Sequence, residues 1–551
     1  MTHTPPPEAI KRAKAFLQSV VVVDDLAFKQ SKIHLNEYAV PQEADEAVDA
    51  ANPDVGVLKI PDNKSGGEHA LDGERISTVF AREGLVCGLL APGGPSGDLA
   101  TEFVKSTERA DVVVLDWKLN RDEGEMAISL LQRLLDEDVA RGGGRLRVVA
   151  VYTGELDLDS IARKLNEMLE QRQGSEPVVV DSDGMAMTKG PVRIVVLAKE
   201  REGSPDAAAS TRQVLLHDLP DRLAEEFAHL TRGLIAGLGL ASISALRSET
   251  HLLLRGLDND TDAAYLGHRL ALPRAADAED HALDLVGAEI RSVLEDYAVK
   301  THVGEAAVQS WLQTHGHLTQ DAMGMDQLKP VIKLPTDVVQ KALVAGLGSK
   351  PVQTEFKQRH DVAKGSVQKL LDFSPYVFAR SEEHGREAER LFANQLFLRT
   401  MYLASLRELR LGTVVRSPNQ KNYLLCIQPL CDSARLPQEG RPFPFVRLDE
   451  VEESKFQFTV TSPETTIVYL GLSKSPGAIN SIGFQPKPGE TTIVALSTND
   501  GGFEYESMDR DTFAWVAELK PEMAQMAVFD IVKGLGRVGI NESETRRLAR
   551  S

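Results

Sequence analysis

The chain has 551 residues, too many for one compact core and enough for about two to four domains. Hydrophobic residues make up 42% of the chain and charged residues 26%, a composition that excludes an intrinsically disordered protein. A formal net charge of −19 makes the surface repel phosphate backbones, so we expect no nucleic-acid partner.

The cysteines and the apolar stretches predict a cytoplasmic protein. Cys87, Cys426 and Cys431 form no CxxC pair, which argues against a disulfide framework or a cysteine zinc site and favours a reducing compartment. Residues 1–17 form an N-terminal segment without the apolar core of a signal peptide. The longest apolar stretch, residues 233–246, is too short to cross a bilayer, so we expect no membrane association.

The first two hundred residues alternate short β-branched runs with segments of helical period. Strands are expected at residues 19–23, 85–90, 111–115, 146–152 and 192–197. Helices are expected at residues 74–83, 98–109, 125–138 and 158–171. Because continuous apolar runs are typical of strands buried on both faces, the pattern predicts a doubly wound α/β domain over residues 18–205, with a parallel five-stranded sheet.

Two stretches interrupt this alternation. Residues 36–72 are acidic and rich in Ala, Pro and Gly, which predicts a long mobile insertion. Residues 177–190 place Asp183-Gly184 between two strand-like runs, which is a hairpin signal.

The remaining chain changes character twice. Residues 206–410 read as a helical domain, with helical regions at 219–257, 276–302 and 331–409. Residues 411–551 read as a small β-rich domain with a C-terminal helix; its strands are expected at 423–427, 456–460, 465–470 and 491–496, and its helix at 513–533. In this part we expect Phe443 and Phe445 to anchor the packing and Cys431 to be a buried cysteine in a strand–turn segment.

Polar residues follow four of the five predicted parallel strands. Asp24 and Asp25 follow the first strand, Asp116 the third, Thr153 the fourth and Lys199 the fifth. The carboxyl ends of the strands in such a sheet converge on one crevice, where ligands bind. We therefore expect three carboxylates, one hydroxyl and one ammonium group to meet in a shallow site.

The chemistry of such a site is restricted. Three neighbouring carboxylates stay ionised only if a cation neutralises them, and oxygen-only ligands on a partly open surface suit Mg²⁺. A carboxylate held there can attack a phosphoryl donor and form an aspartyl phosphate. A lysine ammonium and a threonine hydroxyl would bind the transferred oxygens.

The motifs VVVVDD, VVVLDWKL, VVAVYTG and VVLAKE, with Gly124 eight residues after Asp116, resemble the receiver domain of bacterial two-component response regulators. The resemblance implies a flavodoxin-like domain and a magnesium site. Asp24 and Asp25 would hold Mg²⁺ directly or through water. Asp116 would be nucleophile and metal ligand, and the backbone carbonyl of Lys118 would complete the metal shell. Thr153 and Lys199 would bind the phosphoryl oxygens.

The same resemblance implies a phosphorelay protein. A histidine kinase or a kinase-like ATPase partner would donate the phosphoryl group, and the C-terminal region would signal through protein contacts. No helix-turn-helix follows the receiver-like part, and no dedicated enzyme is expected beyond self-phosphorylation and dephosphorylation of the receiver. The oligomeric state is left open.

Departures from the family pattern keep alternatives open. Glu200 replaces the usual proline after the lysine, and Val196 replaces the aromatic residue that normally couples the threonine to the output surface. One alternative is a non-phosphorylated pseudo-receiver acting as an interaction scaffold in a bacterial stress or phage-defence system. An aspartate-nucleophile phosphohydrolase is disfavoured because Asp24 and Asp25 are adjacent rather than spaced as Asp-x-Asp. His229 faintly resembles a histidine-kinase phosphoacceptor but is more typical of an ordinary helix histidine.

Overall fold

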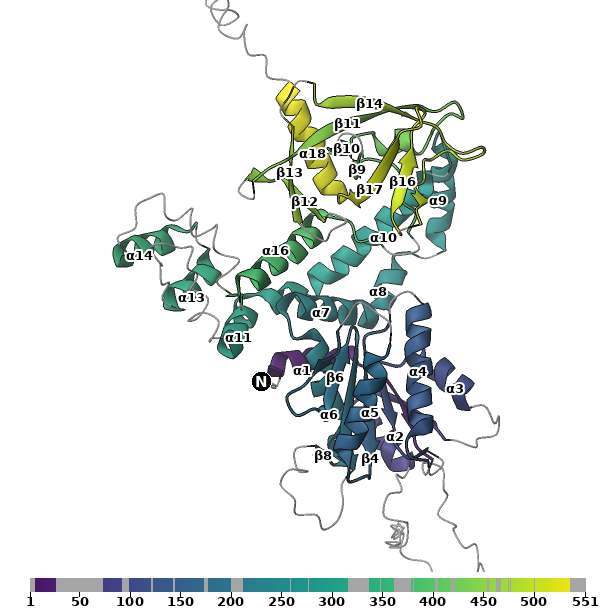
Figure 1. The fold of residues 1–551 in the computed structure, drawn as a ribbon, viewed down its shortest axis with the longest axis vertical. Helices are drawn as coiled ribbons and strands as arrows, with labels where there is room; N and C mark the ends of the chain where they lie inside the picture. Colours follow the sequence, from purple (N-terminus) through teal and green to yellow (C-terminus); the bar gives the residue numbers. More distant parts are fainter. Residues whose placement is uncertain are drawn as a thin grey trace, which may run out of the picture. The chain divides into compact units, whose positions relative to one another are not determined.

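The computed structural model describes two compact units, residues 1–314 and 315–551 (Figure 1). Within them the described residues are 5–25, 73–91, 99–119, 122–141, 144–172, 177–199, 212–257, 259–275, 277–315, 336–346, 348–360, 378–379, 381–401, 405–417, 422–452, 455–461, 467–473, 475, 477–499 and 501–535. The predicted insertion at 36–72 lies outside them. The division at Thr314 falls inside the predicted helical domain 206–410, so helices of that segment belong to both units.

The first unit is built on a mostly parallel sheet. Five parallel strands follow the spatial order β2-β1-β3-β4-β7, which is the order expected of the predicted receiver-like domain. They are β1 (Ser19–Val23), β2 (Val86–Leu90), β3 (Val112–Leu115), β4 (Arg147–Thr153) and β7 (Val192–Lys199). Val23 is in register with both Leu90 and Leu115, so the carboxyl ends of the first three strands are level.

Helices cover both faces of this sheet (Figure 1). One face packs against α1 (Pro7–Phe16), α2 (Gly73–Arg82) and α6 (Leu219–Ala228). The other face packs against α3 (Leu99–Thr107), α4 (Glu125–Ala140) and α5 (Leu158–Glu170). Val20 and Val22 enter the first core, whereas Val21 and Val23 enter the second. The alternation of side chains between two buried faces explains why the strands read as unbroken apolar runs.

The predicted hairpin is present and enlarges the sheet. Strands β5 (Val179–Val180) and β6 (Ala186–Lys189) pair antiparallel across a turn in which Gly184 has a φ of +73°. β6 pairs with the first half of β7, and β8 (Gln213–Val214) pairs with its last two residues. The sheet therefore has eight strands in the described residues instead of the five expected, because short strands cover the edge of β7.

The first unit continues into helices. These are α7 (Leu234–Ser248), α8 (Thr250–Arg255), α9 (Asp260–Ala271), α10 (Asp277–Asp296) and α11 (Glu305–His315). The predicted helical region 219–257 is interrupted by a 3₁₀ turn at His229–Thr231 and by a break at Glu249. Among the described residues, no helix combines the length and apolarity needed to cross a lipid bilayer.

The second unit contains helices α13 (Thr336–Ala345), α14 (Lys350–His360) and α16 (Glu382–Phe397), followed by an antiparallel sheet. Its strands run β12-β13-β11-β10-β9-β17-β16-β15, and β14 pairs with β11. They are β9 (Thr413–Arg416), β10 (Tyr423–Cys426), β11 (Arg441–Glu450), β12 (Phe458–Thr461), β13 (Ile467–Leu472), β14 (Ile479–Phe484), β15 (Leu496–Ser497), β16 (Phe503–Glu506) and β17 (Thr512–Glu518). Phe443 and Phe445 are fully buried in one core of this sheet, as expected of packing anchors.

Three predictions for the second unit are wrong. The predicted last helix, residues 513–533, is wrong in its first part. Residues 513–518 belong to β17, because this aromatic-rich run pairs with β9 and β16, and helix α18 (Pro521–Leu535) begins only at a proline. Of the predicted strand 491–496, only Leu496 lies in a strand, β15. Cys431 is exposed in the short helix α17 (Leu430–Ser433), whereas Cys426 is the buried cysteine.

Candidate functional site

The acidic pair lies where β1 ends. The backbone amide of Asp24 donates to the carbonyl of Leu90 at 3.1 Å, so the sheet pairing continues one residue past the strand. On the other side, the amide of Asp116 donates to the carbonyl of Val23 at 2.9 Å. These two bonds bring the loops after β1 and β3 together at the carboxyl edge of the sheet.

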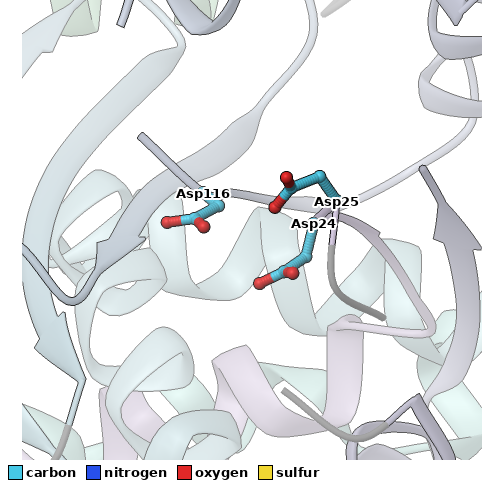
Figure 2. Close-up of side chains that lie close together, drawn as sticks. All are labelled: Asp24, Asp25 and Asp116. Atoms are coloured by element: carbon cyan, nitrogen blue, oxygen red, sulfur yellow. The ribbon is translucent and has the colours of Figure 1, made fainter. Parts of the chain in front are cut away.

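The structure places all three predicted carboxylates in one cluster. One oxygen from each of Asp24, Asp25 and Asp116 lies within 4.8 Å of the other two. Figure 2 shows the three side chains next to one another at the ends of their strands. Asp24 is buried, while Asp25 and Asp116 are partly open to solvent.

Lys199 completes the cluster from the end of β7. Its Nζ lies 2.9 Å from Oδ2 of Asp24 and 3.4 Å from Oδ2 of Asp116. The lysine side chain is 6% exposed, so its charge is scarcely screened by water. The sequence predicts Lys199 near Asp116; its shorter contact with Asp24 is a feature that the motif does not reveal.

The electrostatics of Asp116 are set by burial. Desolvation raises the pKa of Asp116 above the usual range of an aspartate, and the negative charge of Asp24 adds to this effect. The charge of Lys199 and hydrogen bonds from Lys199 and the Trp117 amide lower the pKa but do not compensate for burial. An additional positive charge nearby would therefore favour the ionised form of Asp116.

Thr153 is the last residue of β4, and Lys118 follows the end of β3 by three residues. Among the described residues, neither side chain forms a hydrogen bond or ion pair with Asp24, Asp25 or Asp116. Thr153 is buried, and its hydroxyl accepts a hydrogen bond of 3.2 Å from the amide of Glu155. The Lys118 ammonium group lies 3.2 Å from Glu155 and 3.5 Å from Glu123. Its side chain thus points toward neighbouring acids, and only its backbone carbonyl is available for the role that the resemblance implies.

Gly124 has a specific steric reason to be glycine. Its φ is +94°, and a Cβ built at this position would lie 2.1 Å from Cζ2 of the buried Trp117. Asp122 accepts hydrogen bonds from the amides of Gly124 and Met126 and so caps the start of α4. This turn packs the residue after Asp116 into the core, a contact that sequence reasoning missed.

The donor set fits a hard divalent cation. The cluster offers carboxylate oxygens and no sulfur or imidazole, and two of its three members are solvent-accessible. Lys199 supplies one positive charge against three carboxylates, so the cluster has spare negative charge. Asp24, Asp25 and Asp116 can hold such an ion.

Sequence reasoning also missed a buried ionic network between the hairpin and α6. Arg193 of β7 is 1% exposed; its Nε donates to Glu226 at 2.7 Å and its Nη2 to Asp181 at 2.6 Å. Arg212 contacts both Glu226 and Asp183. Since the network joins the hairpin turn, β7, the segment before β8 and α6, only the folded chain reveals it.

The surroundings of His229 are those of a structural histidine rather than of a phosphoacceptor. His229 is half-buried, and burial together with the charges of Arg193 and Arg232 lowers its pKa to about 4. It is thus an uncharged structural histidine near the network.

His268 and His281 are both exposed, and their ring nitrogens lie 2.8 Å apart across the α9–α10 hairpin, a contact that their sequence spacing did not indicate.

Comparison with known proteins agrees with this geometry for the first part of the chain. Residues 16–204 match the family of response receiver domains. No curated protein and no solved structure matches the chain. The family match and the parallel sheet together confirm an enlarged receiver domain followed by a long C-terminal extension.

Proposed function

We propose that this chain, in which residues 16–204 form a response receiver domain, is a response-regulator-like protein phosphorylated on Asp116 in a Mg²⁺-dependent phosphorelay. One observation carries the proposal. Asp116 shares a cluster with two further carboxylates and with Lys199, at the edge of the sheet where doubly wound folds bind ligands. A carboxylate beside an ammonium group and a cation site is equipped to act as a nucleophile.

The proposed step is a phosphoryl transfer. A carboxylate oxygen of Asp116 attacks the phosphorus of a phosphohistidine or acyl phosphate and forms a new P–O bond. The bond from phosphorus to the donor breaks, and the leaving imidazole or carboxylate departs with the electron pair. The product is an aspartyl phosphate, which hydrolysis by water returns to Asp116 and inorganic phosphate.

The surrounding residues have distinct proposed roles. Lys199 and the Thr153 hydroxyl bind phosphoryl oxygens. To do so, Lys199 gives up its contacts with the carboxylates, and the Thr153 hydroxyl gives up its bond from the Glu155 amide. Asp24, Asp25 and Asp116, with the Lys118 carbonyl, hold Mg²⁺. When bound, Mg²⁺ neutralises charge on the transferred group.

We further propose that the output works through protein contacts of the C-terminal region. The phosphoryl group of an aspartyl phosphate carries about 1.5 to 2 negative charges and replaces the single charge of the carboxylate. The added charge and the new acceptor oxygens can move a loop or re-dock a segment. Hydrogen exchange with and without a phosphoryl mimic tests this idea. A change in residues 219–257 is expected, and its absence in the phosphorylated protein contradicts signalling by docking.

The phosphorylation itself has a direct test. Incubation of the full chain with acetyl phosphate and Mg²⁺, followed by intact-mass measurement, is expected to add one phosphoryl group. Asp116→Asn should abolish the addition, whereas Asp159→Asn on the exposed face of α5 should leave it unchanged. EDTA should prevent it in both the native chain and the control.

The second candidate is a pseudo-receiver scaffold. Val196 is fully buried in the core where the family places an aromatic residue, and Lys199 already bridges two of the three carboxylates. Failure of the native chain to gain mass from several acyl-phosphate donors would favour this alternative.

For the first candidate, we propose that the phosphoryl donor is a histidine kinase or a kinase-like ATPase in the cytoplasm.

The three-part organisation remains a prediction as well. We propose that residues 18–205, 206–410 and 411–551 act as receiver, helical and β-rich parts. Limited proteolysis is the appropriate test, because cleavage should concentrate between parts and spare their cores.

A further inference from the structure

A cavity lies at the opposite edge of the receiver sheet from the carboxylate cluster. It has a volume of about 810 Å³ and is lined by residues of α1, α4 and α7, of the turn after α3 and of the segments that enter β3 and β4. Asp111 and Leu146 of its lining directly precede β3 and β4. In a parallel sheet these positions mark the amino edge, so the two sites are separated by the length of the strands.

The lining of this cavity is rich in guanidinium groups. Arg109, Arg141, Arg145 and Arg247 face three acids. In a chain with a net charge of −19, such a local excess of arginine is unusual. The acids are already neutralised by arginine, as the following contacts show.

Asp111 is 1% exposed and lies 3.2 Å from Arg145 and 3.5 Å from Arg247. Asp138 accepts a bond of 2.7 Å from Arg147, a buried arginine behind the cavity. Each guanidinium carries five N–H donors, so these pairs leave donors available.

Two arginines are especially suited to a ligand. Arg109 is exposed and has no ion-pair partner among the described residues. Arg141 is 46% exposed and lies 2.8 Å from the similarly exposed Glu108, a pair that solvent screens. An incoming anion therefore meets two accessible positive groups and no unneutralised carboxylate.

The opposite wall is apolar. Ile243 is 50% exposed on α7, and Leu146 and Phe16 continue the surface. The Arg247 guanidinium lies 4.9 Å from the centre of the Phe16 ring, and its Nη1 donates to the Phe16 carbonyl at the end of α1. The cavity thus combines the planar guanidinium group of Arg247, an apolar wall and the N–H donors of further arginines, which can bind an anion.

We propose that this cavity binds an organic phosphate of nucleotide size. Its phosphate oxygens would bind Arg109, Arg141 and Arg145, since guanidinium groups bind phosphate through paired hydrogen bonds. Its ring would pack against Ile243 and Leu146. The volume lies within the range of small-molecule sites, about 300–1,000 Å³.

Because the cavity lies between the receiver and α7, a bound ligand would affect how α7 attaches to the receiver. Arg109, Arg141 and Arg145 belong to the receiver, whereas Ile243 and Arg247 belong to α7, so one ligand contacts both segments. Binding would stabilise the attachment of α7 to the receiver. This site does not depend on phosphorylation of Asp116.

Calorimetric titration of the full chain in EDTA with ATP, AMP, adenosine and pyrophosphate tests the proposal. ATP or AMP should bind, and adenosine should not. Arg109→Ala should weaken binding by about tenfold, the effect of losing one charge-assisted hydrogen bond. Arg133→Ala, at an exposed arginine of α4 outside the cavity, and Asp116→Asn should leave the affinity unchanged.

Three outcomes overturn the proposal. The first is no binding of either nucleotide at millimolar concentration. The second is equal binding by the Arg109→Ala variant, which would place the nucleotide elsewhere. The third is pyrophosphate binding as tightly as ATP, which would show that the apolar wall contributes nothing and that inorganic phosphate chemistry alone is recognised.

Discussion

The hydroxyl of Tyr152 donates a buried hydrogen bond of 2.8 Å to the backbone carbonyl of Val214. Tyr152 directly precedes Thr153, and Val214 pairs with Lys199 in the sheet. Residue 214 leads through a short 3₁₀ turn into α6. This bond therefore joins both proposed phosphoryl-binding residues to the segment that begins the C-terminal extension.

We expect Tyr152→Phe to separate phosphorylation from its conformational effect. The variant keeps the ring and the carboxylate cluster, so acetyl phosphate should still modify Asp116. The change in hydrogen exchange of α6 on phosphorylation should shrink by at least about half, because the coupling bond is absent. An unchanged α6 response in the phosphorylated variant would exclude this route, and Tyr265→Phe on α9 serves as the control.

Removal of Lys199 should destabilise the protein most when no divalent cation is present. Lys199→Met removes the ammonium group that contacts both buried Asp24 and Asp116, and breaking such a buried pair costs about 3 kcal/mol or more. Thermal unfolding in EDTA should show this loss, and Mg²⁺ should recover part of it. Lys105→Met, at an exposed position of α3, should have little effect; equal stability of both variants in EDTA contradicts the argument.

Gly124→Ala should destabilise the receiver and slow phosphorylation. The new methyl group would overlap the Trp117 ring at a positive φ, a combination that costs about 1–3 kcal/mol. Displacement of Trp117 also moves the amide that donates to Asp116. Chemical unfolding and the rate of acetyl-phosphate labelling measure the two effects. Gly184→Ala, which has a similar φ and no close neighbour, separates backbone strain from the clash.

Arg193→Met should be among the most destabilising single substitutions in the first unit. It removes the cation shared by buried Glu226 and half-buried Asp181; because Glu226 keeps Arg212 and Arg222, we expect a cost of about 3 kcal/mol. Hydrogen exchange should accelerate in both the hairpin and α6, since the network joins them. Arg163→Met on the exposed face of α5 is the matched control; hairpin protection equal to that of the native chain would show that the network is not stabilising.

Acidification should weaken the packing of α6 through His229. Its pKa is about 4 in the folded chain and about 6.5 when unfolded, so the unfolded state binds more protons between these values. Stability is therefore retained above pH 6.5 and lost as the pH falls toward 4. Arg193 and Arg232 disfavour the charged imidazole, whereas Glu226 and Asp181 favour it, and burial decides the direction.

Because His229 is partly exposed, we expect a loss of about 1 kcal/mol, measured as faster hydrogen exchange of α6 at pH 5 than at pH 7 after correction for intrinsic rates. His229→Asn should reduce this pH dependence. An identical pH dependence in the native chain and the variant would assign the effect to the carboxylates of the network.

The receiver domain could be predicted because each of its strands can be recognised from its own short run of apolar residues. Strand β1 is a run of four valines after Ser19, and its burial on both faces leaves no polar residue to obscure the pattern. The cluster followed from the topology, since Asp25 and Asp116 end neighbouring parallel strands. No side-chain geometry was needed for that inference.

Other features depend on distant parts of the chain. Residues 512–518 carry the apolar content of a helix, and only pairing with β9 and β16 makes them a strand. In the sequence, Arg193 is only a charged residue that interrupts an apolar strand. Its ion pairs with Asp181 and Glu226 exist only in the folded chain. The arginine-lined cavity is likewise assembled from α4, α7 and the turn after α3, and no sequence spacing relates these segments.

The family match ends at residue 204, yet α6 begins at Leu219 and supplies part of the core of the receiver. Leu223 and Phe227 lie fully buried in the same cluster as Val20 and Val22. Gene rearrangements that joined this receiver to another output at the domain boundary would remove one wall of its interior. A receiver cut at that boundary would therefore expose the apolar side chains of β1 that α6 now covers.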